Sequence, residues 1–204
     1  MRSIKCHCEH VFEADLPEIV DLDKEPDLVQ KIISGSFLGT VCPACGTNLH
    51  PELKTRIDWP SRSVHLELIP ELERTSFMAG TTEHAADCTP VIGYPELADR
   101  VAVINADLDP ITVEAVKFML LQHADSDSQD SQPVAIFEGR PQEEVLEFHI
   151  HGIKKDEVAV SRVPYSLYEK VYADIQANPE KEPYIFLKNQ SYISIQNICF
   201  ETGE

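Results

Sequence analysis

Apolar residues along the chain recur every second residue in some segments and every third or fourth in others. Val64-His65-Leu66-Glu67-Leu68 alternates cleanly, which predicts a strand with one buried face, paired with residues 53–59 across the turn 60–63. Further strand-like segments lie at 11–22, 100–104, 134–138, 145–150 and 158–163, with a final hairpin formed by 184–188 and 192–200. The chain therefore contains enough strand signals for at least one sheet.

Three segments carry a helical pattern. In the first, Asp23 is the expected N-cap and Gly35 follows as the C-cap. One apolar face is formed by Leu28, Val29, Ile32 and Ile33. The second starts at Asp109 as N-cap and is apolar enough to be mostly buried, and the third follows Pro164 and ends at residues 178–179. Because strands and helices alternate irregularly, we expect an α+β fold.

Residues 125–133 are polar throughout and of low complexity. Such a stretch is typical of a flexible connection, so we expect a domain at 1–124, a linker at 125–133 and an α+β region at 134–204. The alternative is that 125–133 is a long surface loop inside one domain.

The composition indicates a folded chain outside the membrane. Of its 204 residues, 43% are hydrophobic, yet no apolar run approaches the roughly 18 residues that a spanning helix needs. The opening residues 1–5 contain no apolar stretch typical of a secretory signal, which predicts a cytoplasmic location.

The formal net charge is −18, and no segment of the chain is basic. Nucleic-acid binding depends on lysine and arginine to neutralise phosphates, so we do not expect it here. A strongly acidic surface instead favours solubility or docking of a basic partner, and we expect a protein partner.

Two close cysteine pairs carry the clearest chemistry. Cys6 and Cys8 stand near the start, and Cys42-Pro43-Ala44-Cys45-Gly46 forms a well-defined knuckle after a gap that contains the first predicted helix. Two such pairs can supply four thiolates to one tetrahedral Zn²⁺. We therefore predict a structural four-cysteine zinc site on an N-terminal zinc-ribbon-like element with a helical insertion. Disulfides are less favoured in a cytoplasmic chain.

The first pair leaves the ligand set open. Only one residue separates Cys6 from Cys8, and His7 or His10 could replace Cys6 as a ligand. Either histidine could equally face solvent.

Several other polar residues invite weaker interpretations. His149 and His151 share one face of a predicted strand, and Asp107 and Asp109 could act as paired carboxylates, although capping already explains Asp109.

Two further cysteines admit simpler explanations. His84 and Cys88 could pair at i, i+4 on a helix, or Cys88 could be a buried thiol, while Cys199 is expected in the core.

The cysteine pattern resembles that of the CpXC-domain family of bacterial proteins. The resemblance rests on the knuckle at 42–46, on the earlier cysteines followed by His10 and Phe12, and on the stretch 100–121. Cys6-His7-Cys8 departs from the usual pair by one residue and lacks its proline. The resemblance implies a zinc-ribbon-like element in a larger α+β body and implies no activity.

We therefore expect a cytoplasmic bacterial zinc protein that acts as a binding or adaptor module for another macromolecule. One alternative is an enzyme with a site around Asp107, Asp109, His149 and His151. The other is a thiol redox sensor that releases zinc on oxidation.

Overall fold

The computed structural model describes residues 1–122, 133–154, 156–188, 191–196 and 198. The fold is a mixed α+β structure with several small sheets, as the sequence pattern predicted. Its contacts divide the chain into two compact units, Met1–Ala98 and Asp99–Glu204. Among the described residues, no helix combines the length and apolarity required to traverse a membrane.

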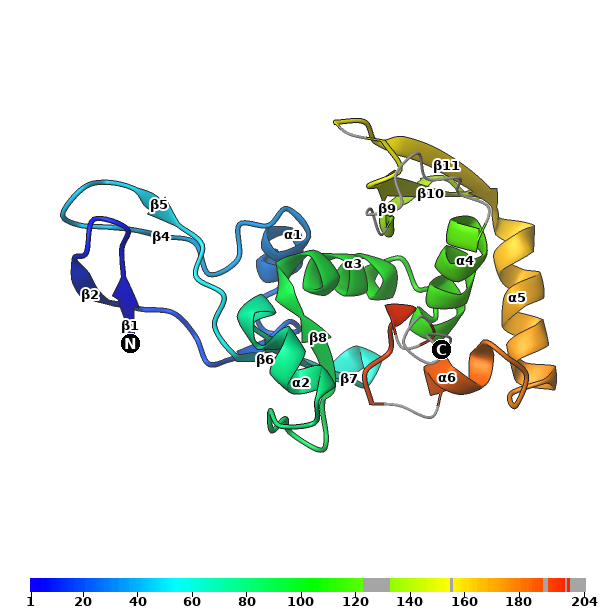
Figure 1. The fold of residues 1–204 in the computed structure, drawn as a ribbon, viewed down its shortest axis with the longest axis horizontal. Coiled ribbons are helices and arrows are strands. Elements are labelled where there is room, and N and C mark those ends of the chain that lie inside the picture. Colours follow the sequence, from blue (N-terminus) through cyan, green and yellow to red (C-terminus); the bar gives the residue numbers. More distant parts are fainter. Residues whose placement is uncertain (123–132, 155, 189–190, 197, 199–204) are drawn as a thin grey trace. The chain divides into compact units, whose positions relative to one another are not determined.

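Two short antiparallel hairpins stand at the N-terminal end of the first unit (Figure 1). Their strands are β1 (Arg2–Lys5), β2 (Val11–Ala14), β4 (Thr40–Val41) and β5 (Asn48–Leu49). Pairing of Ile4 with Phe12 and of Val41 with Asn48 sets the two registers. Each hairpin places one cysteine pair in its turn.

Helix α1 (Asp27–Ile33) lies between the hairpins in sequence and buries Val29 and Ile32. The prediction that Asp23 caps this helix was wrong. Pro26 occupies the cap position, and the Asp23 carboxylate instead accepts hydrogen bonds from the backbone and hydroxyl of Ser61 at 2.7 and 2.6 Å. The charged side chain is used in a contact with a distant turn, which local spacing does not reveal.

A four-stranded sheet in the order β3-β6-β7-β8 forms the body of the first unit. Its strands are β3 (Ile19–Asp21), β6 (Thr55–Trp59), β7 (Val64–Ile69) and β8 (Thr89–Ile92). The predicted pairing of residues 53–59 with 64–69 is confirmed, since Ile57 lies opposite Leu66. The turn between them is η1 (Pro60–Arg62), and η2 (Glu71–Glu73) and α2 (Arg74–Met78) follow β7.

The strand predicted at residues 100–104 was wrong, because these residues belong to helix α3 (Gly93–Asn105). β-Branched valines and isoleucine favoured a strand locally. Leu97, Val101 and Ile104, however, recur at i, i+4 and i+7, and all three are buried. Burial along a helical stripe outweighed the local strand preference.

The second unit packs helices against a three-stranded sheet in the order β11-β10-β9. Its elements are α4 (Pro110–Gln122), β9 (Val134–Gln142), β10 (Val145–His151), β11 (Ala159–Pro164), α5 (Tyr165–Ala177) and α6 (Tyr184–Lys188). The core includes Phe137 and Phe148, whose rings meet edge to face with centroids 5.6 Å apart. The predicted strands and the helices starting at Asp109 and Pro164 are confirmed.

The prediction of a final hairpin was wrong, since residues 184–188 form helix α6. Aromatic and β-branched residues again suggested a strand. Tyr184 and Leu187 are buried one helical turn apart, and the Tyr184 hydroxyl donates to Asp174 Oδ2 at 2.8 Å.

The division between units falls at residues 98 and 99, within α3, and α4 packs with α5, α6 and β9. The expected domains at 1–124 and 134–204 stay a prediction. Nearly all of the expected linker at 125–133 lies outside the described residues, so its role as a linker stays a prediction.

Candidate metal centre

The first hairpin turn fixes Cys6 and Cys8 by main-chain hydrogen bonds. The Cys6 N–H donates to the His10 carbonyl and the Glu9 N–H donates to the Cys6 carbonyl, both at 2.9 Å. Glu9 adopts a left-handed conformation with φ 68°. The tight turn compensates for the single residue between the cysteines and returns the chain to β2.

The second turn holds Cys42 and Cys45 in the same manner. The Cys42 N–H donates to the Thr47 carbonyl and the Gly46 N–H donates to the Cys42 carbonyl, both at 2.9 Å. Gly46 has φ 72°, a conformation that glycine adopts at little cost. The glycine that follows the knuckle is therefore required by the turn itself.

The two turns bring the sulfur atoms of Cys6, Cys8, Cys42 and Cys45 within 4.8 Å of one another. Across the hairpins, Cys6 Sγ lies 3.6 Å from Cys45 Sγ, and Cys8 Sγ lies 3.8 Å from Cys42 Sγ. A tetrahedral ion with metal–sulfur bonds of about 2.3 Å separates its sulfurs by about 3.8 Å. The cluster therefore has the size of a four-sulfur metal site.

The cluster is half enclosed. Cys6 and Cys42 are buried, whereas Cys8 and Cys45 are exposed. Within the described part of the chain, neither His7 nor His10 joins the group, and Cys6 occupies the fourth position. The alternative in which a histidine replaces Cys6 therefore has no support in this geometry.

The environment shifts the pKa values of two of the thiols in opposite directions. The hydroxyl of Thr47, whose Oγ1 lies 3.1 Å from Cys45 Sγ, and the Thr47 backbone lower the pKa of Cys45 to about 6. At Cys6 a hydrogen bond from the Cys8 backbone favours the thiolate. Burial and the neighbouring thiols outweigh that bond and raise the pKa of Cys6 to about 12. Four adjacent thiolates repel one another, so a bound cation is what would permit full deprotonation.

The four cysteines can hold a metal ion. Soft thiolates select zinc and other thiophilic ions over magnesium or calcium, and all four positions of a tetrahedron would be filled by the protein. Such a site leaves no position for a reacting water.

Two of the other candidate residues, Asp109 and His149, make local contacts. Asp109 caps α4 by accepting hydrogen bonds from the Thr112 N–H at 2.8 Å and hydroxyl at 2.6 Å. His149 lies 3.3 Å from a Glu138 oxygen and 3.5 Å from a Glu147 oxygen, and His151 is exposed at the end of β10.

The structure describes one of the two remaining cysteines, Cys88, and not the other, Cys199. The segment that contains His84 and Cys88 is not helical, so the proposed i, i+4 pair was wrong, and Cys88 is a buried thiol with 5% exposure. Cys199 lies outside the described residues.

The sequence pattern did not reveal a buried charged network in the second unit. Lys117 Nζ donates to Asp99 Oδ2 at 2.5 Å and to Glu114 Oε1 at 2.8 Å, and all three side chains are at least nine-tenths buried. The carboxylates also accept the N–H groups of Phe137 and Ile195. These bonds join α3, α4, β9 and the segment after α6.

An α+β protein with four cysteines clustered on two hairpins belongs to the class of proteins that can hold one metal ion in a four-cysteine site. A family model described as CpXC protein matches residues 4–117, which include all four cysteines. The chain belongs to the CpXC family, as the resemblance predicted.

One relative matches over nearly its whole length. The chain is 36% identical to an uncharacterised protein of Treponema pallidum (strain Nichols), over 97% of this chain and 98% of that protein. No solved structure matches.

Proposed function

We propose that this protein is a binding or adaptor module whose N-terminal hairpins are held together by a structural Zn²⁺ on Cys6, Cys8, Cys42 and Cys45. The observation that carries the proposal is the cluster of four sulfurs, all within 4.8 Å of one another, across two hairpins. The hairpin strands have two to four residues each, too short to form a core of their own. Metal binding supplies that missing stability, on the order of 10 kcal/mol or more in zinc-finger peptides.

A closed site supports a binding role over catalysis, because it activates no water. The net charge of −18 favours a basic protein partner, and a Zn²⁺ with four thiolates adds further negative charge. Thiolate ligands persist in a reducing compartment, which agrees with a cytoplasmic bacterial protein.

The adaptor proposal is tested by purification from the native cells after cross-linking, followed by reconstitution with each captured protein. We expect one basic protein to form a stoichiometric complex that weakens as salt rises. Cys42→Ser should lose this complex, whereas Cys88→Ser, which alters a thiol outside the cluster, should keep it. The proposal is overturned if wild type retains no more protein than Cys42→Ser, or if the purified chain turns over a small molecule.

A second function, thiol redox sensing, is favoured by the exposure of Cys8 and Cys45. Peroxide would take two electrons from a pair of thiolates, which would form a disulfide while the peroxide is reduced to water. The short sulfur distances run between hairpins, so cross-links of Cys6 with Cys45 and of Cys8 with Cys42 are expected. Mass spectrometry after peroxide treatment decides this: unchanged thiol and metal counts would eliminate the sensor.

A further inference from the structure

One face of the sheet in the first unit is unusually polar. Residues Val20, Ile57 and Leu66 bury the other face. On the polar face, Arg56 lies opposite Glu67 across β6 and β7 and beside Ile19 on β3. A sheet in a small unit needs only one face for its core, so the opposite face can carry charged residues.

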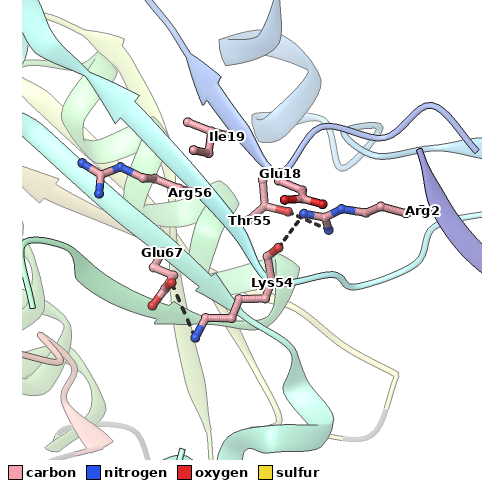
Figure 2. Close-up of a pocket in the computed structure, with 7 residues that line it drawn as sticks. All are labelled: Arg2, Glu18, Ile19, Lys54, Thr55, Arg56 and Glu67. Carbon is pink, nitrogen blue, oxygen red and sulfur yellow. Dashed lines mark hydrogen bonds and ion pairs between the residues drawn. The ribbon is translucent and has the colours of Figure 1, made fainter. Parts of the chain in front are cut away.

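This face carries a shallow, open hollow of about 470 Å³. Figure 2 shows the side chains that line it: Arg2, Glu18, Ile19, Lys54, Thr55, Arg56 and Glu67. They come from separate segments of the first unit. Three are cationic, two are anionic, one is apolar and Thr55 is polar and neutral.

Most of these charges are already satisfied within the protein. Arg56 pairs with Asp58 at 2.9 Å and with Asp87 at 2.9 Å. Lys54 Nζ donates to the Glu83 carbonyl at 2.6 Å and lies 3.6 Å from Glu67, which also accepts the Ala85 N–H. These pairs stabilise the walls of the hollow.

Arg2 and Glu18 differ from the other charged residues. The Arg2 guanidinium donates only to neutral acceptors, the Lys54 carbonyl at 2.8 Å and Thr55 Oγ1 at 3.4 Å. Across the ranges that the structure describes, no carboxylate lies within ion-pair distance of Arg2 and no cation within that distance of Glu18. Within the described part of the chain, the hollow therefore presents one cation and one carboxylate that lack an ion-pair partner.

Ile19 completes the recognition surface, because this residue is 64% exposed. A ligand that satisfied all three residues would carry a carboxylate for Arg2, an ammonium group for Glu18 and an aliphatic portion for Ile19. The guanidinium uses two of its five N–H donors in the protein, which leaves donors for a carboxylate.

We propose that this hollow binds a small zwitterion with an aliphatic side chain, such as a free α-amino acid. Arg2 holds the carboxylate, Glu18 the ammonium group and Ile19 the side chain. The site is separate from the cysteine cluster and goes beyond the adaptor role.

The proposal is tested on the full-length protein by following backbone amide NMR signals during titration with three probes. L-Leucine carries both charges, 4-methylpentanoate only the carboxylate and 3-methylbutylamine only the ammonium group. We expect leucine to shift the amides of Ile19, Lys54 and Thr55 in a saturable manner, and each single-charge probe to bind about tenfold more weakly or worse.

Two variants test which residue binds the carboxylate of leucine and which binds its ammonium group. Arg2→Gln should weaken leucine binding about tenfold and leave the amine unaffected, and Glu18→Gln should weaken leucine equally and leave 4-methylpentanoate unaffected. Lys170→Gln and Glu169→Gln alter exposed residues on α5 and serve as controls. The proposal is overturned if 4-methylpentanoate binds as tightly as leucine, or if leucine gives no saturable shift at about 10 mM, well above a Kd of about 1 mM.

Discussion

Removing the ammonium group of Lys117 should destabilise the second unit severely. Lys117→Met leaves a side chain of similar length but without charge, so Asp99 and Glu114 face each other as buried anions. Lys117 is 5% exposed and donates to both carboxylates. Loss of one partner from a buried ion pair costs about 3–5 kcal/mol, because the remaining charge is uncompensated.

The pH dependence distinguishes this mechanism from simple loss of packing. Lys117 and Arg100 hold the pKa of Glu114 below its usual value against the opposing effect of burial, and the two carboxylates raise the pKa of Lys117 against burial. In wild type, the Glu114 contribution is present above its unfolded pKa of 4.5 and is lost as pH falls below it. The Lys117 contribution is present below 10.5 and is lost as pH rises through the raised folded pKa.

In Lys117→Met, the Lys117 charge no longer opposes burial, which raises the pKa of Glu114, so the native state takes up a proton before the unfolded state does. The loss of stability should therefore be smaller at pH 5 than at pH 8.

Urea unfolding measures the effect. A loss of about 4 kcal/mol with a slope of about 2 kcal/mol/M moves the midpoint by about 2 M. Five of the six tyrosines lie in the second unit, whereas the only tryptophan, Trp59, lies in the first. Tyrosine absorbance should therefore report the shift more strongly than Trp59 fluorescence.

Two further variants complete the test. Lys170→Met, on the exposed face of α5, should change little. Adding Asp99→Asn and Glu114→Gln to Lys117→Met should recover much of the loss, since the amide oxygens can still accept the N–H groups of Phe137 and Ile195. A shift corresponding to less than about 1 kcal/mol, or one independent of pH, would refute the reasoning.

Three other predictions follow from single contacts. Asp109→Ala removes the cap of α4 and should lower stability by about 1 kcal/mol in thermal unfolding, whereas Asp109→Asn should retain most of it. Hydrogen bonds from Lys181, Tyr184 and Asn178 lower the pKa of Asp174 to about 2. The contribution of this carboxylate to stability is therefore present above pH 3.8 and is lost as pH falls toward 2. NMR titration of the Asp174 carboxyl in wild type and in Lys181→Met should show a higher pKa in the variant. Gly46→Ala forces a side chain into a left-handed turn at φ 72° and should weaken zinc binding in a competition titration with a chelator. The control is Gly80→Ala, at φ 70° in a turn that is remote in sequence from the cysteines, and it should leave zinc binding unchanged.

The sequence was most informative where chemistry and spacing are local. The cysteine turns could be predicted because each pair lies within three residues and Gly46 marks the turn. Helix α4 was predicted because Asp109 and Pro110 are local signals that the structure uses directly.

Elements were misjudged where burial outweighed local preference. In α3 and α6, aromatic and β-branched residues suggested strands, but the buried stripes through Val101 and Leu187 are helical. The network around Lys117 could not be predicted, because its charges come from two separate helices, α3 and α4, and resemble surface residues in the sequence. The same holds for Arg2 and Glu18, which only the folded chain brings to one hollow.

The most direct test of the metal centre is the zinc content of the freshly purified full-length protein, with reactive thiols counted before and after addition of a chelator. We expect one zinc per chain and four thiols that become reactive when the metal is removed. We also expect loss of amide protection in the two hairpins, and zinc content unchanged by Cys88→Ser. Protein that is purified under reducing conditions without zinc, or that releases zinc while its hairpins remain equally protected, would contradict a structural zinc site.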